Sequence, residues 1–235
     1  MEEEKEANPR HKTELLDHIS QRIESLYSNE EIHLEEIPLV EFLDTICNEA
    51  ISSMGERNLT IIRSFERGLT ITMDREALRK VCLGLLKNAI ENTPDEGKVE
   101  VISSSRDKAV LIDVRDYGVG ITEDNQKMIF GGFFHTQDND FYSSKRPYEF
   151  NAGGSGSDLL RAKSFSEQYG FEIDFESTRC PFIPHDTDRC SGRISSCCFI
   201  ADKSQCFSSG GSTFSLTFPM KRSAYETSDR QEKDS

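Results

Sequence analysis

The stretch from residue 74 to residue 95 constrains the fold most, because it specifies a helix together with both of its ends. Asp74 is a suitable N-cap, and Pro94 disfavours helical geometry in the residue before it. A helix with one apolar face must pack that face against another layer of the protein. The apolar residues recur at the spacing of one helical face, at Ala77, Leu78, Val81, Cys82, Leu85, Leu86, Ala89 and Ile90.

The segments on either side of this helix supply the second layer. Their order predicts an α+β fold in which helices pack on one face of a mixed β-sheet. A long irregular stretch at 130–157 interrupts the pattern, and loops of this length are usually functional or mobile. Residues 1–12 and 221–235 are polar, and we expect both ends to be disordered. Strands are expected at 59–65, 69–73, 98–103, 109–114, 171–177 and 213–218, and further helices at 13–27, after Pro38 and at 159–169.

Length and charge narrow the class of protein. The 235 residues suit one sizeable domain with extensions, and the net charge of −14 argues against a nucleic-acid partner, because a phosphate backbone is bound by a basic face. A single nucleotide remains compatible, since main-chain amides, a metal ion and one or two cations can hold it. No apolar run reaches the roughly 20 residues of a membrane helix, and the acidic start does not resemble a signal peptide. We therefore expect a cytoplasmic chain without membrane contact from this segment.

Four short segments contain residues suited to binding a ligand or to catalysis. The first, Asp116-Tyr-Gly-Val-Gly-Ile121, follows an apolar strand directly. Its glycines let the backbone approach a planar ligand, and an ionised aspartate there can accept a hydrogen bond from the amino group of adenine. A plain hairpin turn explains the same residues equally well.

The second segment is Leu85–Thr93 on the strongest helix. Asn88 lies one turn from both Gly84 and Asn92, so the three share a face. Asparagine is a poor residue for the middle of a helix, and its amide oxygen is a suitable Mg²⁺ ligand beside phosphate oxygens. A solvated asparagine is the alternative.

The third and fourth segments are rich in glycine. Asn151–Leu160 opens the helix expected at 159–169, where free main-chain amides can bind an anion. Gly210-Gly-Ser-Thr-Phe214 enters the last strand, and it would also suit any junction between a loop and a strand.

In this order the segments resemble the nucleotide-binding boxes of the ATPase fold shared by gyrase, Hsp90, histidine kinases and MutL, and most closely those of sensor histidine kinases. Residues 84–94 resemble the N box, 116–121 the first glycine box and Phe130–Phe134 the F box. Gly153–Gly156 resembles the second glycine box and Gly211–Thr213 the third. The resemblance covers residues 33–220. It implies a Bergerat-type two-layer sandwich of a mixed sheet against helices, with a long mobile ATP lid.

The resemblance assigns roles to particular residues. Asp116 would bond the adenine amino group, with Thr213 supporting it from the sheet. Asn88 would hold Mg²⁺ beside the transferred phosphate. Catalytic roles fall to Asn88 and to two cations of the lid (residues 133–155), Lys145 and Arg146, with His135 a further candidate. The nucleotide-binding set is Asn88, Asn92, Asp116, Gly118, Gly120, Ile121, Phe134, Gly153, Gly154, Gly156 and Thr213.

Three positions depart from the family pattern. The first asparagine of the N box is Gly84, which removes a polar partner from the metal side. The Gly-Leu-Gly-Leu pattern of the family becomes Gly156-Ser-Asp-Leu159, which places Asp158 near the phosphates, where we expect it to act as an N-cap and to compete with phosphate for main-chain amides. The aromatic residue that often stacks on the base is Asn92.

The phosphoacceptor is the largest departure. Histidine kinases phosphorylate a histidine that is followed by an acidic residue on a dimerising helix, and none of His11, His18 and His33 is followed by one. His185-Asp186 follows Pro184 in a cysteine-rich loop that cannot form such a helix. Residues 13–32 resemble the end of a dimerisation hairpin. We therefore expect the acceptor helix outside this chain, either upstream of a truncated N-terminus or in a partner.

The remaining feature is a cysteine-rich insert at 180–206, where the family has a short connection. Seven cysteines in a cytosolic chain are not expected to form a disulfide scaffold. Such an insert is expected to lack a core, and a bound metal would explain how it holds its shape. Free thiols or a redox-sensing pair are the alternatives. Four of its cysteines suffice for a tetrahedral zinc site: Cys180, Cys190, Cys197 and Cys206.

Together these observations predict a domain that binds Mg·ATP and transfers the γ-phosphate to a histidine on a dimerisation helix, with a response regulator receiver domain as the next partner. Catalysis would come from positioning and charge neutralisation. Three other functions fit the sequence: a non-catalytic ATP-dependent interaction switch, a serine kinase of the anti-sigma-factor type, and a metal-binding interaction module with a vestigial pocket.

Overall fold

A computed structural model describes residues 33–130, 146–152 and 157–220. The chain divides into two units, Met1–Leu34 and Glu35–Ser235, and the architecture below is that of the second. A five-stranded mixed sheet forms one layer, in the order β2-β4-β5-β7-β6. Its strands are β2 (Thr60–Phe65), β4 (Lys98–Arg106), β5 (Ala109–Asp116), β6 (Glu172–Thr178) and β7 (Gly211–Pro219).

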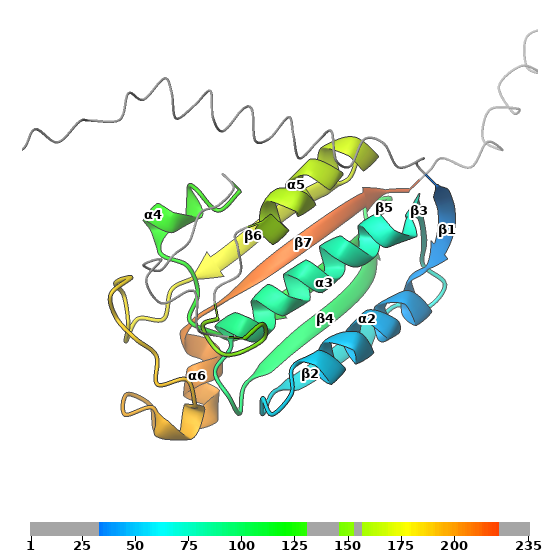
Figure 1. Cartoon of the computed structure of the whole chain (residues 1–235). Coiled ribbons are helices and arrows are strands. Elements are labelled where there is room, and N and C mark those ends of the chain that lie inside the picture. The colour runs from blue at the N-terminus through cyan, green and yellow to red at the C-terminus, as the bar shows by residue number, and fades with distance from the viewer. Residues whose placement is uncertain (1–32, 131–145, 153–156, 221–235) are drawn as a thin grey trace, which may run out of the picture. The chain divides into compact units, whose positions relative to one another are not determined.

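Three helices form the second layer, on one face of this sheet (Figure 1). The central helix α3 packs against β5, while α2 and α5 pack near the two edges, at β2 and β6. The predicted fold class is therefore confirmed: helices cover one face of a mixed sheet. The three helices are α2 (Leu39–Ser53), α3 (Arg75–Asn92) and α5 (Ser157–Tyr169).

Alternation along β5 shows where the core lies. Val110, Ile112, Val114 and Asp116 are buried beneath the helices, and the residues between them face the open side of the sheet. One carboxylate thus continues an apolar row to the end of the strand, and that end lies beside the C-terminal end of α3. The geometry of the strand therefore points Asp116 into the layer between the sheet and the helices.

Helix α3 has the ends that the sequence predicts. The Asp74 carboxylate accepts a hydrogen bond from the Ala77 amide at 2.8 Å, which is an N-cap interaction. The helix ends at Asn92, two residues before Pro94, and its apolar positions are buried. This local prediction is confirmed on both boundaries.

Several elements were not predicted. Strand β1 (Leu34–Pro38) pairs with β3 (Thr70–Asp74) in a separate two-stranded sheet. Consequently β2 and β3, which follow each other along the chain, do not form a hairpin; β2 instead pairs with β4 in parallel. The cysteine-rich insert contains a 3₁₀ turn, η2 (Ile194–Ser196), and leads into α6 (Lys203–Ser209), and α4 (Glu123–Gln126) follows the first glycine box.

Candidate nucleotide-binding site

The candidate site begins with Asp116 at the end of β5. Its side chain is buried, and its Oδ1 accepts a hydrogen bond from the Gly118 amide at 2.9 Å. Burial raises the pKa of Asp116 to about 7, and hydrogen bonds from Gly118 and Ser212 oppose that rise. Once ionised, a buried carboxylate of this kind is a strong hydrogen-bond acceptor, which is what recognition of an amino group requires.

Two glycines after Asp116 allow this loop to fit between α3 and β6. A Cβ atom on Gly118 would lie 2.0 Å from the main-chain oxygen of Asn92, and one on Gly120 would lie 1.9 Å from that of Thr178. Gly120 also has a φ of +65°, a conformation that favours glycine. The loop is therefore closely packed between the two layers, and only glycine fits at both positions.

Ser212, and not Thr213, supports Asp116 from the neighbouring strand. In the antiparallel register Asp116 pairs with Ser212, whereas Thr213 pairs with Arg115. Successive residues of a strand point to opposite faces, so Thr213 lies on the open face, away from Asp116. The predicted role of Thr213 is wrong in this respect. The Ser212 hydroxyl also lies 3.0 Å from that of Ser177 on β6.

Ile121 fastens the end of the first glycine box to β6. Its amide donates a hydrogen bond to the Ser177 Oγ at 2.9 Å. The side-chain amide of Gln126 on α4 donates to the main-chain oxygens of Ile121 and Ser177, at 2.9 Å and 3.1 Å. Ile121 therefore contributes to the shape of the site through its backbone.

The N-box face of α3 provides the polar side chains. Asn88 is half-buried, and its side-chain amide has no hydrogen-bond partner among the described residues. Asn92 is exposed, and its side-chain amide donates to the Asn88 main-chain oxygen at 2.8 Å. Asn88 thus has an amide oxygen available for a metal ion, and it fits the role that the resemblance implies.

The described end of the lid, residues 146–152, lies against the C-terminal half of α3. The Tyr148 amide donates to the Glu91 carboxylate at 3.0 Å, and the Asn151 amide donates to the Glu91 main-chain oxygen at 2.7 Å. Burial raises the pKa of Glu91. Arg146, a predicted catalytic cation, is exposed at the start of this segment. The other lid predictions lie outside the described residues: Phe134, His135, Lys145, Gly153, Gly154 and Gly156.

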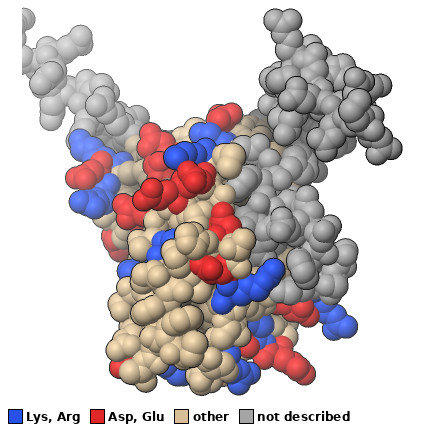
Figure 2. Space-filling model, turned by 90° about the vertical axis from the view of Figure 1, so that its left-hand side faces the viewer, with Lys and Arg blue, Asp and Glu red and all other residues tan. Residues whose placement is uncertain are grey.

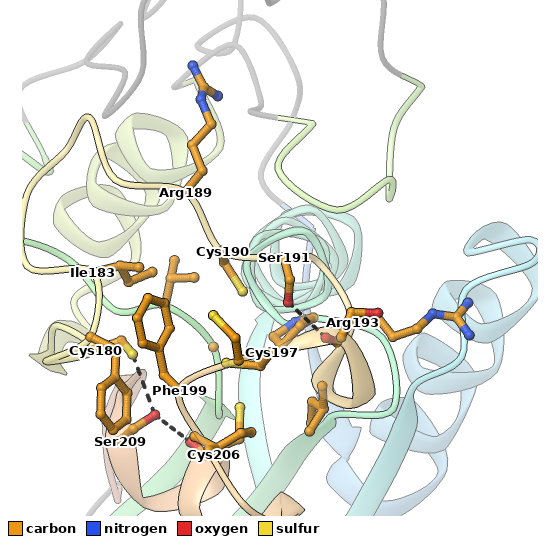
Figure 3. Close-up of a pocket in the computed structure, with 18 residues that line it drawn as sticks. Cys180, Ile183, Arg189, Cys190, Ser191, Arg193, Cys197, Phe199, Cys206 and Ser209 are labelled. Atoms are coloured by element: carbon orange, nitrogen blue, oxygen red, sulfur yellow. Dashed lines mark hydrogen bonds between the residues drawn. The ribbon is translucent and has the colours of Figure 1, made fainter.

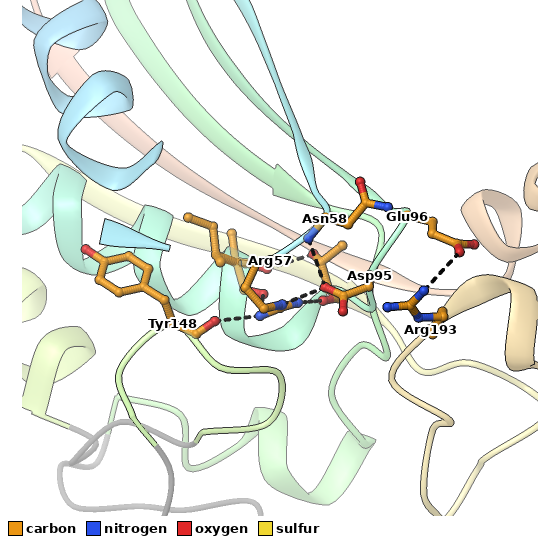
Figure 4. Close-up of polar contacts among 9 residues, drawn as sticks. Arg57, Asn58, Asp95, Glu96, Tyr148 and Arg193 are labelled. Atoms are coloured by element: carbon orange, nitrogen blue, oxygen red, sulfur yellow. Dashed lines mark hydrogen bonds and ion pairs between the residues drawn. The ribbon is translucent and has the colours of Figure 1, made fainter. Parts of the chain in front are cut away.

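Arg57 holds this lid end in place, as Figure 4 shows. Its side chain is 9% exposed and pairs with the Asp95 carboxylate at 2.7 Å. The same guanidinium donates to the main-chain oxygen of Tyr148 at 2.5 Å and to that of Thr93 at 2.6 Å. It donates to the main-chain oxygen of Ile90 at 3.3 Å as well. One buried arginine therefore connects the end of α3, the turn before β4 and the lid.

Asp158 does not act as the predicted N-cap. Helix α5 begins at Ser157, so Asp158 lies inside its first turn. Its carboxylate oxygens lie 3.3 Å from Lys87 and 3.3 Å from Arg161. The expected competition for main-chain amides is thus replaced by pairing with two cations. Sequence reasoning missed Lys87, Arg57 and Ser212, because each acts through a contact between segments distant in the chain. It also missed Arg161, although its contact with Asp158 is a local i,i+3 pair on α5.

The described residues do not support the zinc prediction for the cysteine-rich insert. All seven cysteines lie within the described residues and are free. The part of the chain that the structure describes holds no group of three or more His, Cys, Asp or Glu side chains placed to bind a metal. Instead, the predicted ligands lie around a cavity of about 160 Å³ whose walls also carry Phe182, Ile183, Ile194 and Phe199 (Figure 3).

Contacts within the protein hold the insert in shape. Ile183 and Ile194 are buried, contrary to the expectation that the insert has no core. Main-chain hydrogen bonds join Gly192 and Ile194 to Asp95, at 2.9 Å and 3.1 Å, and Cys180 to Val119 at 3.0 Å. The lower part of the face in Figure 2, where the insert lies, carries few charged side chains.

Burial affects the pKa of two thiols of the insert. Burial raises the pKa of Cys206 to about 11 and raises that of Cys190 as well. A protonated thiol is a poor nucleophile. Both cysteines lie in the wall of the cavity, where burial lowers the reactivity of their thiols.

Residues 73–222 match the family described as "Histidine kinase-, DNA gyrase B-, and HSP90-like ATPase". The match covers more than half of the chain, so the chain belongs to this family. The chain is also 33% identical over 135 residues to the adaptive-response sensory kinase SasA of Rippkaea orientalis, which is 55% of this chain and 32% of that protein. It spans about a quarter to a third of the length of such curated relatives.

Solved structures share the fold. Full-length ShkA in complex with AMPPNP has a TM-score of 0.56 at 19% identity, over 81% of this chain and 32% of that one. Histidine kinase ThkA in complex with the response regulator protein TrrA has a TM-score of 0.55 at 19% identity, over 90% of this chain and 49% of that one. Among the described residues of our chain, none of the helices is both long and apolar enough to span a bilayer.

Proposed function

We propose that this chain is the ATP-binding catalytic domain of a sensor histidine kinase. It binds Mg·ATP and presents the γ-phosphate to a histidine on a dimerisation helix that the sequence does not contain. The observation that carries the proposal is the buried Asp116 carboxylate, which lies in a glycine-lined loop beside the N-box face of α3. Family membership supports ATP as the nucleotide.

The residues at the base end and at the phosphate end of the site have different roles. Asp116 accepts a hydrogen bond from the adenine amino group, and Ser212 holds that carboxylate in place. Asn88 binds Mg²⁺ together with phosphate oxygens. When bound, Mg²⁺ neutralises negative charge on the phosphates during transfer. Arg146 and Lys145 are the proposed lid cations, and the glycines at 153–156 supply main-chain amides to the phosphates.

Partners and location follow from the family. We infer a response regulator receiver domain as the acceptor of the phosphoryl group, and the solved complex of ThkA with TrrA supports that choice. The histidine-bearing helix is supplied in cis or in trans. Seven free cysteines agree with a reducing, cytoplasmic location.

A binding experiment tests the nucleotide site. The purified chain is titrated with a fluorescent ATP analogue in the presence of Mg²⁺, and the same measurement is made on Asp116→Ala, Ser212→Ala and Thr213→Ala. We expect a large loss of affinity for Asp116→Ala, a smaller loss for Ser212→Ala, and no change for Thr213→Ala, which lies on the opposite face of the same strand as Ser212. Unchanged affinity in Asp116→Ala would refute the proposed site.

The interaction switch is the second candidate, because Gly84 and Asp158 alter the phosphate end of the site. Labelled ATP with a separately purified histidine-bearing helix distinguishes the candidates. Acid-labile phosphorylation of the helix supports the kinase. ATP binding without phosphoryl transfer supports the interaction switch. Acid-stable phosphorylation of a partner indicates a serine kinase.

A further inference from the structure

Two positions that depart from the family pattern meet in the structure. Gly84 on α3 and Asp158 on α5 are 74 positions apart in the chain, but a Cβ atom built on Gly84 would lie 3.2 Å from the Asp158 Cβ and 3.5 Å from its Cγ. That contact is tighter than ordinary van der Waals distance. The missing side chain at 84 is therefore what leaves room for the side chain at 158.

The carboxylate admitted in this way is paired with two cations. One oxygen of Asp158 lies 3.3 Å from the Lys87 ammonium, and the other lies 3.3 Å from the Arg161 guanidinium. Asp158 itself is only 16% exposed, so the pairs are partly shielded from water. Lys87 also lies 3.9 Å from Glu91. Both cations thus have a protein carboxylate as their partner.

The two cations lie next to residues that the proposed function assigns to the phosphates. Lys87 directly precedes Asn88, the proposed Mg²⁺ ligand, and Arg161 is in the first two turns of α5, which follows the glycine run at 153–156. Both side chains keep some exposure, 23% for Lys87 and 28% for Arg161. Partly exposed cations near a helix N-terminus are well placed for a polyphosphate.

We propose that Lys87 and Arg161 bind the phosphates of the nucleotide, and that Asp158 competes with the phosphates for both cations. The inference rests on the proposed ATP site. Asp158 sets the affinity for ATP: the carboxylate holds the cations in the free protein, and the phosphates displace it. The family pattern has an asparagine amide at position 84. In this chain the Asp158 carboxylate occupies that space, so a charged group controls the affinity of the site for ATP.

The test separates the phosphate end from the base end by comparing ATP with adenosine. Affinities for both are measured by calorimetry for the wild type, Asp158→Asn, Lys87→Met and the double variant. Asp158→Asn is nearly isosteric and removes the competing charge, so it should raise ATP affinity about tenfold. Lys87→Met should lower ATP affinity by a similar factor. Adenosine affinity should stay the same in each variant, and the gain from Asp158→Asn should shrink in the double variant.

A matched control comes from the same helix. Lys163 and Glu167 form an exposed ion pair on α5 with an N–O distance of 3.6 Å. Lys163→Met and Glu167→Gln remove equivalent charges away from the site, and neither should change the ratio of ATP to adenosine affinity. Circular dichroism of all variants checks that the fold is retained.

Three results would overturn the proposal. An unchanged or lower ATP affinity in Asp158→Asn shows that the carboxylate does not compete. If Asp158→Asn lowers ATP affinity in the presence of Mg²⁺ but not in EDTA, Asp158 is instead a metal ligand. Unchanged ATP affinity in Lys87→Met removes the cation role. Failure of the underlying ATP site has a different signature, because the wild type would then bind neither ATP nor adenosine, and both proposals would fall.

Discussion

Replacing Asp116 by asparagine should stabilise the free protein and weaken ATP binding at the same time. Burial raises the pKa of this carboxyl from 3.8 to about 7 in the folded state. Between these two values the folded protein binds a proton that the unfolded chain has lost. The stability contributed by Asp116 is therefore fully present below pH 3.8, and it is lost as the pH rises through about 7.

The magnitude follows from the same shift. A separation of about three pH units, at about 1.4 kcal/mol per unit, corresponds to roughly 4 kcal/mol of unfolding free energy lost above pH 7. Between pH 5 and pH 8 the loss is roughly 2.5 kcal/mol. Asparagine has no proton to lose in this range, so the variant should not show this dependence.

Urea unfolding at pH 5 and pH 8 measures the effect. The quantity of interest is the unfolding free energy of Asp116→Asn minus that of the wild type, because other titrating groups cancel in this difference. It should be larger at pH 8 than at pH 5 by roughly 2.5 kcal/mol. Asp174→Asn is the control, since Asp174 is an exposed residue of β6, and its difference should be the same at both pH values.

The reasoning fails if the difference for Asp116→Asn does not change between pH 5 and pH 8. Such a result would mean that the carboxyl is hydrated or paired in solution. The nucleotide provides an independent check, because the adenine amino group requires a hydrogen-bond acceptor. ATP affinity of the wild type should therefore rise as the pH increases through about 7, as the carboxyl ionises.

Three further predictions concern other parts of the structure. Arg57→Met removes a buried cation with four hydrogen bonds, so it should lower the unfolding free energy by about 3 kcal/mol and the Tm by roughly 6–12 °C. A fall in Tm of only about 1 °C or less would contradict the role of Arg57. Thermal unfolding also tests the contact of α3 with α5. Gly84→Asn alone should lower the unfolding free energy by about 1–3 kcal/mol, and adding Asp158→Gly should recover most of that loss. If the losses of the two single variants simply add in the double variant, the contact is contradicted. Towards a thiol reagent at pH 8, exposed Cys198 should react quickly and Cys82 slowly, because burial raises the pKa of Cys82 to about 12; rapid labelling of Cys82 in folded protein would refute its burial.

Helix α3 shows what could be predicted from the sequence. Its apolar spacing, its N-cap at Asp74 and its end before Pro94 all depend on residues within four positions of one another. The same is true of the single strands, whose alternation fixes which residues share a face. The order of the glycine boxes was also readable, and it led to the family that residues 73–222 match.

Pairing between distant segments could not be predicted in this way. Alternation indicated β2 and β3 as strands, yet only long-range contacts placed them in different sheets. The alternation of Phe214, Leu216 and Phe218 puts Ser212, and not Thr213, on the buried face of β7, but only the pairing of β7 with β5 brings Ser212 opposite Asp116. The cysteine spacing suggested a zinc site, but the fold spread the thiols around a cavity.

The sequence by itself therefore determined most of the helices and strands and the order of the nucleotide boxes, because hydrogen bonding and side-chain periodicity within a helix or strand are local. The tertiary structure decided which faces meet. It placed Asp158 over Gly84, Arg57 against the lid end and Ser212 beside Asp116, since each contact joins segments separated by many residues, and its free energy is gained only when the layers pack together.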